Sequence, residues 1–268
     1  MKMESKFSST CPQDIPLTSS RLNRDIELAP AVKAQFEEIS SKTIAYCHES
    51  LDNSRFFSLL KAGSVSEALM QYTFLQYHHW RDRLHQWFGL CIVKAGSCTD
   101  PDEKSAIMSL ADHTFTDLQD GHSEMYVEFL HELGLSDAEI IAAQRSPATI
   151  SYERSFFDEF GYGTDNFYEA LAALSGRELC VSVRNMRLLH FYFDARGMKH
   201  PTWLSLHAEL EVNHFQDSIR PVLTRYDGDS TKLSSVIKAV ERGINRHVQY
   251  FEDLLHEYES QVDSRNEC

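Results

Sequence analysis

The chain has 268 residues and a formal net charge of -14, with 42% hydrophobic and 25% charged residues. This length and composition suit one globular domain with a sizeable core. The negative charge and the lack of a Lys/Arg cluster argue against nucleic acid as a partner, because a phosphate backbone would be repelled. The low numbers of Gly and Pro, 11 and 7, and the scarcity of alternating apolar runs favour an all-α fold.

Signals of secretion and membrane insertion are lacking in the sequence. Its six cysteines show no C-x-x-C spacing, and it has neither a charged-then-apolar leader nor an apolar run of about 18 residues. We therefore expect a cytoplasmic protein with buried or inert thiols and no membrane partner.

Apolar residues recur at three-to-four spacing along most of the chain, as in amphipathic helices. This pattern predicts long helices over residues 30–48, 66–94, 101–118, 122–134, 165–196, 201–220 and 229–261. Short helices near 53–62 and 136–160 would fill the gaps. The two ends lack the pattern, which predicts a flexible segment over 1–28, a helical domain over 29–262 and a loose C-terminus over 263–268.

An arginine interrupts the apolar stripe of the predicted helix 66–94. Arg81 continues the three-to-four spacing of Phe74, Tyr77 and Leu84. An Arg on the core side of a helix is either paired with a structural carboxylate or available to bind a carboxylate of a substrate. Both roles stay open, so Arg81 is a candidate substrate-binding residue.

Two predicted helices meet at Gly121, where an acid and a histidine lie close in sequence. His122 precedes Tyr126 by one turn and therefore enters the core at the start of its helix. Gly121 is expected to break the helix just before it, so helical phase cannot relate His122 to the residues upstream. We prefer Asp117 as the carboxylate beside His122 and keep Asp112 in reserve.

The pair Glu128-x-x-His131 resembles a metal-binding motif but lies on the wrong side of its helix. Together with Glu211-x-x-His214, it imitates the paired Glu-x-x-His motifs of ferritin-like di-iron bundles. However, Glu128 and His131 share the polar face opposite Phe129. We predict that they are solvated and bind no metal.

A carboxylate is predicted to face the core from the helix 165–196. Leu171 and Leu174 precede Glu178 by seven and four residues, and Val181 follows it by three, so all four share one side of the helix. A carboxylate on that side needs a partner. Glu169 lies nine residues away, about 180° around the helix, and should face solvent.

The most informative stretch contains His207, Glu211 and His214. In an α-helix these residues fall within about 60° of one another, on the stripe that also holds Trp203 and Leu204. Two imidazoles and a carboxylate should therefore face the core together. A buried carboxylate is costly unless it is paired or coordinated, and His/Asp/Glu sets suit iron with open positions for dioxygen. A hydrogen-bonded core cluster would explain the same pattern.

In their order along the chain, these residues resemble the heme-oxygenase-like di-iron oxidases and oxygenases, relatives of thiaminase-II-like and PqqC-like proteins. The similarity lies in the arrangement: an acid and a His before a helix that ends in Leu133-Gly-Leu135, a Glu on a long helix, and then His-x-x-x-acid-x-x-His. It covers roughly residues 30–220 and implies a single-domain, heme-oxygenase-like helical bundle of about seven main helices.

Carried over residue by residue, the resemblance implies six metal ligands, which fit two irons: Asp117, His122, Glu178, His207, Glu211 and His214. The family more often has Glu at the first position, so the shorter Asp117 is a departure that puts one iron in doubt. The segment Tyr77-His-His-Trp80 resembles the pocket-lining helix of the family, which makes Tyr77 a second candidate for substrate binding.

The resemblance also implies a function. Such an enzyme uses a reduced pair of Fe2+ ions and the co-substrate O2 to oxidise a small molecule. The reactions implied are N-oxygenation, oxidative decarboxylation with C–C cleavage, or desaturation of an amine, amino acid or carboxylate, in specialised metabolism. An external electron donor and a homodimer are left open. The alternative is a metal-free thiaminase-II-like or PqqC-like hydrolase or oxidase, or a small-molecule-binding protein, because fold alone does not give function.

Overall fold

The computed structural model describes residues 30–119, 121–158, 166–227 and 229–266, which contain helices and no strand. The first helices are α1 (Pro30–Asp52), α2 (Arg55–Lys61), α3 (Glu67–Arg81), α4 (Leu84–Val93), α5 (Pro101–Gln119), α6 (His122–Glu132), α7 (Asp137–Ala142) and α8 (Pro147–Phe156). They are followed by α9 (Phe167–Leu188), a π-helical turn η2 (Leu189–Phe193), a 3-10 turn η3 (Asp194–Arg196), α10 (Thr202–Arg225) and α11 (Ser230–Asn266). The predicted all-α fold is confirmed, and the N-terminal segment 1–28 lies outside the described residues.

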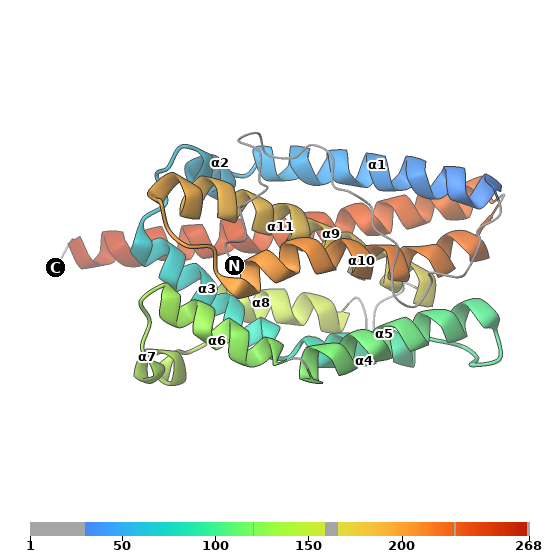
Figure 1. Ribbon diagram of the computed structural model, residues 1–268, viewed down its shortest axis with the longest axis horizontal. Coiled ribbons are helices and arrows are strands. Elements are labelled where there is room, and N and C mark those ends of the chain that lie inside the picture. The colour runs from blue at the N-terminus through green and yellow to red at the C-terminus, as the bar shows by residue number, and fades with distance from the viewer. Residues whose placement is uncertain (1–29, 120, 159–165, 228, 267–268) are drawn as a thin grey trace, which may run out of the picture.

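Long helices form the body of the molecule. Figure 1 shows α1, α9, α10 and α11 running along its length, with α3 to α8 along the other flank. α9 packs against both α10 and α11, and α10 in turn packs against α5 and α6. Side chains that point inward from α5, α6, α9 and α10 can therefore meet in one region.

The central helix, α9, is buried almost entirely around its circumference. Within it, only Glu169 and Met186 are not buried. A helix buried on all sides is normally apolar, yet the buried residues of α9 include Arg177, Glu178 and Arg184. Charged groups at such positions must be paired or must coordinate a ligand, so this part of α9 carries more than packing.

Two glycines allow α9 and α11 to approach each other closely. A Cβ atom at Gly176 would overlap with the carbonyl oxygen of Val240 on α11, and one at Gly243 would overlap with the carbonyl oxygen of Ala173 on α9. The two contacts are reciprocal, so each helix requires a glycine at this crossing. The crossing fixes the backbone of α9 directly before Arg177 and Glu178.

The predicted helix 66–94 is divided into α3 and α4 at Asp82 and Arg83. Both of these residues have polar side chains, while the apolar spacing continues across them, which is why periodicity alone gave one long helix. The predicted helix 165–196 likewise changes at its end from α9 to the turns η2 and η3. The predicted helices thus exist, but two of them are composite.

Three helices, α1, α10 and α11, extend by several residues beyond their predicted ends, and α1 ends at Asp52. α10 passes through Pro221 and ends at Arg225. Val222 and Leu223 are fully buried, and this packing offsets the backbone hydrogen bond that Pro221 cannot make. α11 continues to Asn266, into the segment that we predicted to be loose.

Within the described ranges, no helix combines the length and the apolar character that crossing a bilayer requires. Of the cysteines placed there, Cys47, Cys91 and Cys180 are buried and Cys98 is exposed, and none forms a disulfide with another. Burial raises the pKa of the Cys91 thiol to about 12, which makes it inert as a nucleophile at neutral pH.

Candidate metal centre

Three of the predicted ligands lie on the inward face of α10. His207 and Glu211 are 5% and 3% exposed, and His214 is partly exposed. Their spacing of four and three residues places them on one stripe of the helix, together with the buried Trp203 and Leu204. This stripe faces α9 and α5, against which α10 packs.

α9 contributes Glu178, which is 1% exposed. The guanidinium of the adjacent Arg177 donates a hydrogen bond to Oε1 of Glu178 and lies 4.1 Å from the ring centroid of Trp80. The other oxygen of Glu178, Oε2, is buried and has no hydrogen-bond partner among the described residues. That oxygen is therefore available to a cation.

The junction of α5 and α6 supplies the acid and the histidine predicted there. Gly121 has a φ of 68°, in the left-handed region that favours glycine, and α6 begins at the next residue. His122 is 2% exposed, and its Nδ1 lies 2.6 Å from Oδ1 of Asp117. Asp112 is exposed and makes no such contact. The structure thus brings Asp117, and not Asp112, to His122.

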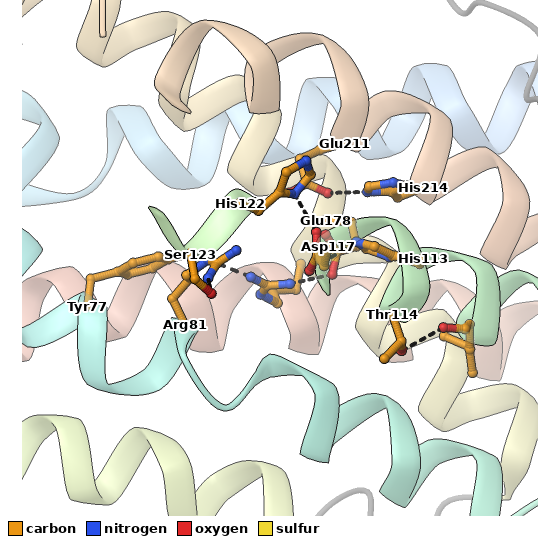
Figure 2. Close-up of polar contacts among 12 residues, drawn as sticks. Tyr77, Arg81, His113, Thr114, Asp117, His122, Ser123, Glu178, Glu211 and His214 are labelled. Carbon is orange, nitrogen blue, oxygen red and sulfur yellow. Dashed lines mark hydrogen bonds and ion pairs between the residues drawn. The ribbon is translucent and has the colours of Figure 1, made fainter. Parts of the chain in front are cut away.

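All six predicted ligands come together in two groups of potential donors. One consists of Glu178, Glu211, His214 and a further histidine, His113; the other consists of Asp117, His122 and His207. In each group the donor atoms lie within 4.8 Å of one another. The groups adjoin, because Nε2 of His113 lies 3.9 Å from Oδ2 of Asp117. Figure 2 shows residues of both groups converging from α5, α6, α9 and α10.

Three of the histidines are oriented through their Nδ1 atoms. Nδ1 of His207 lies 2.8 Å from the carbonyl oxygen of Trp203, to which it donates, and Nδ1 of His214 lies 2.8 Å from Oε2 of Glu211. Nδ1 of His122 is engaged by Asp117 (Figure 2). Such contacts fix the tautomer and the ring orientation of metal-binding histidines and leave Nε2 as the donor atom.

Burial holds three histidines of the centre, His113, His207 and His214, in their neutral form. Burial lowers the pKa of His207 to about 3. Burial also lowers the pKa of His214 and, with His214 beside it, holds the pKa of His113 well below its usual range. A neutral imidazole is the form that binds a metal ion, so no proton has to be removed from these rings at neutral pH.

The carboxyl groups behave differently. Burial raises the pKa of Glu178 well above its usual range; the nearby Arg177 lowers this pKa and the nearby Glu211 raises it further. Burial also raises the pKa of Glu211. Burial would raise the pKa of Asp117 too, but the hydrogen bond to His122 and the nearby His113 lower it. Two adjacent buried carboxyl groups require either a shared proton or a cation between them.

The donor set fits iron. Oxygen and nitrogen donors that are each about 2.1 Å from one ion lie at most about 4.2 Å apart, and in each group the donor atoms are all within 4.8 Å of one another. Imidazole and carboxylate together suit divalent iron, and two histidines with one carboxylate are the ligands of many iron oxygenases. The orphaned Oε2 of Glu178 is a further sign that a cation belongs here.

A cavity of about 320 Å³ opens beside the two groups, between α5, α6 and α10. His113, His122 and His214 belong to its lining. The rest of the lining is mixed polar and apolar: Ser109, Leu110, Asp112, Thr116, Met125, Leu206, Leu210, Asn213, Asp217 and Ser218. The volume is sufficient for a small molecule to reach the histidines.

The two predicted substrate-binding residues lie beside the centre and are not part of this cavity lining. Nη1 of Arg81 donates a hydrogen bond of 2.6 Å to Oγ of Ser123 (Figure 2). Tyr77 is 1% exposed, and its hydroxyl accepts a hydrogen bond of 3.4 Å from Arg177. Contact of either residue with a substrate stays a prediction.

Sequence reasoning missed His113 and Arg177. A signal for His113 was present, because it follows the buried Ala106 and Leu110 by seven and three residues and so shares their face of α5. Arg177 gave no such signal, since it is directly adjacent to Glu178 and periodicity assigns adjacent residues to different faces. By contrast, the expected solvent exposure of Glu128 and His131 is observed.

The fold matches solved structures over most of the chain. A domain of unknown function with a heme oxygenase-like fold from Shewanella denitrificans is 15% identical, with a TM-score of 0.66 over 83% of this chain and 93% of that one. A TenA homologue from Pseudomonas syringae pv. tomato is 13% identical, with a TM-score of 0.66 and coverages of 86% and 98%. A CADD-like protein of unknown function from Nostoc punctiforme is 14% identical, with a TM-score of 0.63 and coverages of 84% and 98%. At these identities the similarity establishes the heme-oxygenase-like fold alone.

The family of the protein is identified by comparing its sequence with family models. No curated protein matches the chain significantly. Residues 71–248, well over half of the chain, match the family model described as iron-containing redox enzyme. This range contains every donor of both groups. The protein therefore belongs to the family of iron-containing redox enzymes.

Proposed function

We propose that the protein is a non-haem di-iron oxidase or oxygenase that uses dioxygen to oxidise a small molecule. The observation that carries the proposal is the convergence of seven histidine and carboxylate side chains in two adjoining groups inside the bundle. Membership of the iron-containing redox enzymes supports iron as the metal. Two adjoining sets of donors support a pair of ions.

Within this proposal the protein groups have separate tasks. The contacts at Nδ1 hold His122, His207 and His214 so that their Nε2 atoms face the ions. Glu178 and Glu211 balance the positive charge of the ions, and burial strengthens this attraction by excluding water. When bound, two ferrous ions would supply the electrons with which dioxygen is activated.

The cavity beside the centre supports a substrate that carries an amino group. Its described lining includes the acids Asp112 and Asp217 and neither Lys nor Arg. Such a lining attracts a cationic amine and disfavours a molecule whose only charge is a carboxylate. Among amines, amino acids and carboxylates, we therefore favour the first two, with N-oxygenation, oxidative decarboxylation or desaturation as the reaction.

The test begins with metal. Protein freed of metal is loaded with ferrous iron under anaerobic conditions, and iron is counted by elemental analysis, with up to two irons per chain expected. The loaded protein is then mixed with dioxygen, and oxygen consumption is followed with primary amines and amino acids, each paired with its N-acetyl derivative. Oxygen consumption should be faster with each free amine than with its N-acetyl derivative.

A different result would favour the alternative function. If the protein takes up no iron, or binds zinc alone, the oxygenase proposal fails. The protein would then have to be a metal-free hydrolase, a cofactorless oxidase or a small-molecule carrier, in which the His/Glu groups form a hydrogen-bonded network. If the protein takes up iron but shows no preference for free amines, the oxygenase proposal stands, and the proposal that the substrate carries an amino group fails.

A further inference from the structure

His113 is held in a fixed position on α5 by aromatic stacking. Its ring centroid lies 3.5 Å from that of His214, with an angle of 27° between the planes, and 4.5 Å from that of Phe88 on α4. The side chain is 8% exposed. The imidazole is thus confined to the inner wall of the cavity and cannot turn to solvent.

The polar atoms of this ring have no hydrogen-bond partner among the described residues. Nε2 of His113 lies 3.9 Å from Oδ2 of Asp117, which is longer than a hydrogen bond. Because His113 lines the cavity, its ring nitrogens take their partner from outside the protein, either water or a metal ion. The other three histidines of the centre, in contrast, all have a partner at Nδ1.

The missing partner can be a metal ion. A donor nitrogen of His113 lies within 4.8 Å of donor atoms of Glu178, Glu211 and His214. We propose that His113 is a seventh metal ligand, which completes a four-donor site with Glu178, Glu211 and His214. This inference rests on the proposed function, and it leaves Asp117, His122 and His207 as a separate three-donor site.

The division into four and three donors makes the two sites unequal. A site with two histidines and two carboxylates offers a metal ion one more protein donor than a set of two histidines and one carboxylate. The four-donor site should therefore bind its ion more tightly, and His113 should be responsible for the difference. The three-donor site keeps more positions for exchangeable ligands.

The experiment titrates metal-free protein with Co2+ under anaerobic conditions and follows the visible absorption of the bound ion, which reports the number and type of its ligands. The main variant is His113→Phe, which retains the stacking with His214 and Phe88 and removes the donor atom. The matched control is His79→Phe, the same substitution at a partly exposed histidine on α3, outside both groups. Circular dichroism checks that each variant is folded.

Wild-type protein and His79→Phe should bind two Co2+ ions with the same spectrum. His113→Phe should bind one of them at least about ten-fold more weakly, with an altered spectrum. In a second variant, His113→Ala, added imidazole should enter through the cavity and restore the wild-type spectrum, which a purely structural role would not allow. If His113→Phe and His113→Ala keep the wild-type affinity and spectrum, the inference is overturned while the proposed function stands. If wild-type protein itself binds no metal, it is the proposed function that fails.

Discussion

Nδ1 of His122 lies 2.6 Å from Oδ1 of Asp117, on the other side of the turn at Gly121. The left-handed backbone of Gly121 allows α5 to end and α6 to begin within three residues. The acid near the end of one helix therefore meets the first residue of the next. This contact links two helices and, at the same time, orients one histidine of the candidate centre.

The first prediction concerns this acid. Asp117→Ala should lower the amount of bound iron, because it removes the only carboxylate of its group, whereas Asp112→Ala should leave the amount unchanged. Asp117→Glu should retain binding, because the longer carboxylate can still reach the ion. Elemental analysis after anaerobic ferrous loading distinguishes these outcomes. Loss of iron in Asp112→Ala alone would mean that the wrong acid has been assigned.

A second prediction separates the inward and outward residues. His207→Ala and His214→Ala should each abolish dioxygen-dependent activity and weaken iron binding with little loss of helicity, because both rings face the centre. Glu128 and His131 lie on the solvated face of α6. Replacing either of them with Ala should change the free energy of unfolding by no more than about 0.5 kcal/mol. Loss of iron in Glu128→Ala would instead support a ferritin-like arrangement of ligands.

The third prediction is a dependence of stability on pH. His247 is buried between Arg184, which donates to its Nε2 at 3.1 Å, and the hydroxyl of Tyr152, 2.9 Å from its Nδ1. Burial, together with Arg184 and Arg177, holds the pKa of His247 well below its usual range. Because the unfolded chain has a pKa of about 6.5 at this group, it binds more protons than the folded chain, and the free energy of unfolding should fall as pH drops below about 6.5.

This group contributes a slope of at most about 1.4 kcal/mol per pH unit. Urea unfolding of the metal-free protein between pH 7 and pH 5 measures the total slope. His247→Gln should reduce the slope, and substitution of the exposed His256 by Gln serves as the control. An unchanged slope in His247→Gln would show that this histidine does not couple folding to protonation.

The fourth prediction tests the crossing of α9 and α11. Gly176→Ala and Gly243→Ala should each destabilise the protein by about 1–3 kcal/mol, because the added Cβ overlaps with a backbone carbonyl that cannot move aside freely. Gly89→Ala is the matched control. Gly89 is inside α4 with open space at its Cβ position, so this change should be neutral or stabilising by up to about 1 kcal/mol. Thermal or urea unfolding of the three variants provides the measurement.

Helical phase was sufficient to predict most of the centre. On α10 the spacing of His207, Glu211 and His214 follows directly from 3.6 residues per turn, and on α9 the leucines before Glu178 indicate its side. His113 was missed because the break at Gly121 removes His122 as a phase reference for the residues before it. Phase within α5 alone, relative to its own buried residues, would have included it.

Other features lie beyond what periodicity can give. The break at Asp82 and Arg83 interrupts a stripe whose spacing continues unchanged, so only the packing of α3 and α4 against different neighbours determines it. Burial of Arg177 beside Glu178 depends on α9 being covered on all sides, which is a property of the assembled bundle. The ends of α10 and α11 are likewise set by tertiary packing.

The position of Arg177 has an optical consequence. Its guanidinium contacts Glu178 of the centre on one side and lies over the indole of Trp80 on the other. The emission of an indole is sensitive to a charge held against its face, so any event that changes the charge on Glu178 shifts the electric field at Trp80. The indole of Trp80 is thus an intrinsic fluorophore that a single side chain, Arg177, connects to the candidate metal centre.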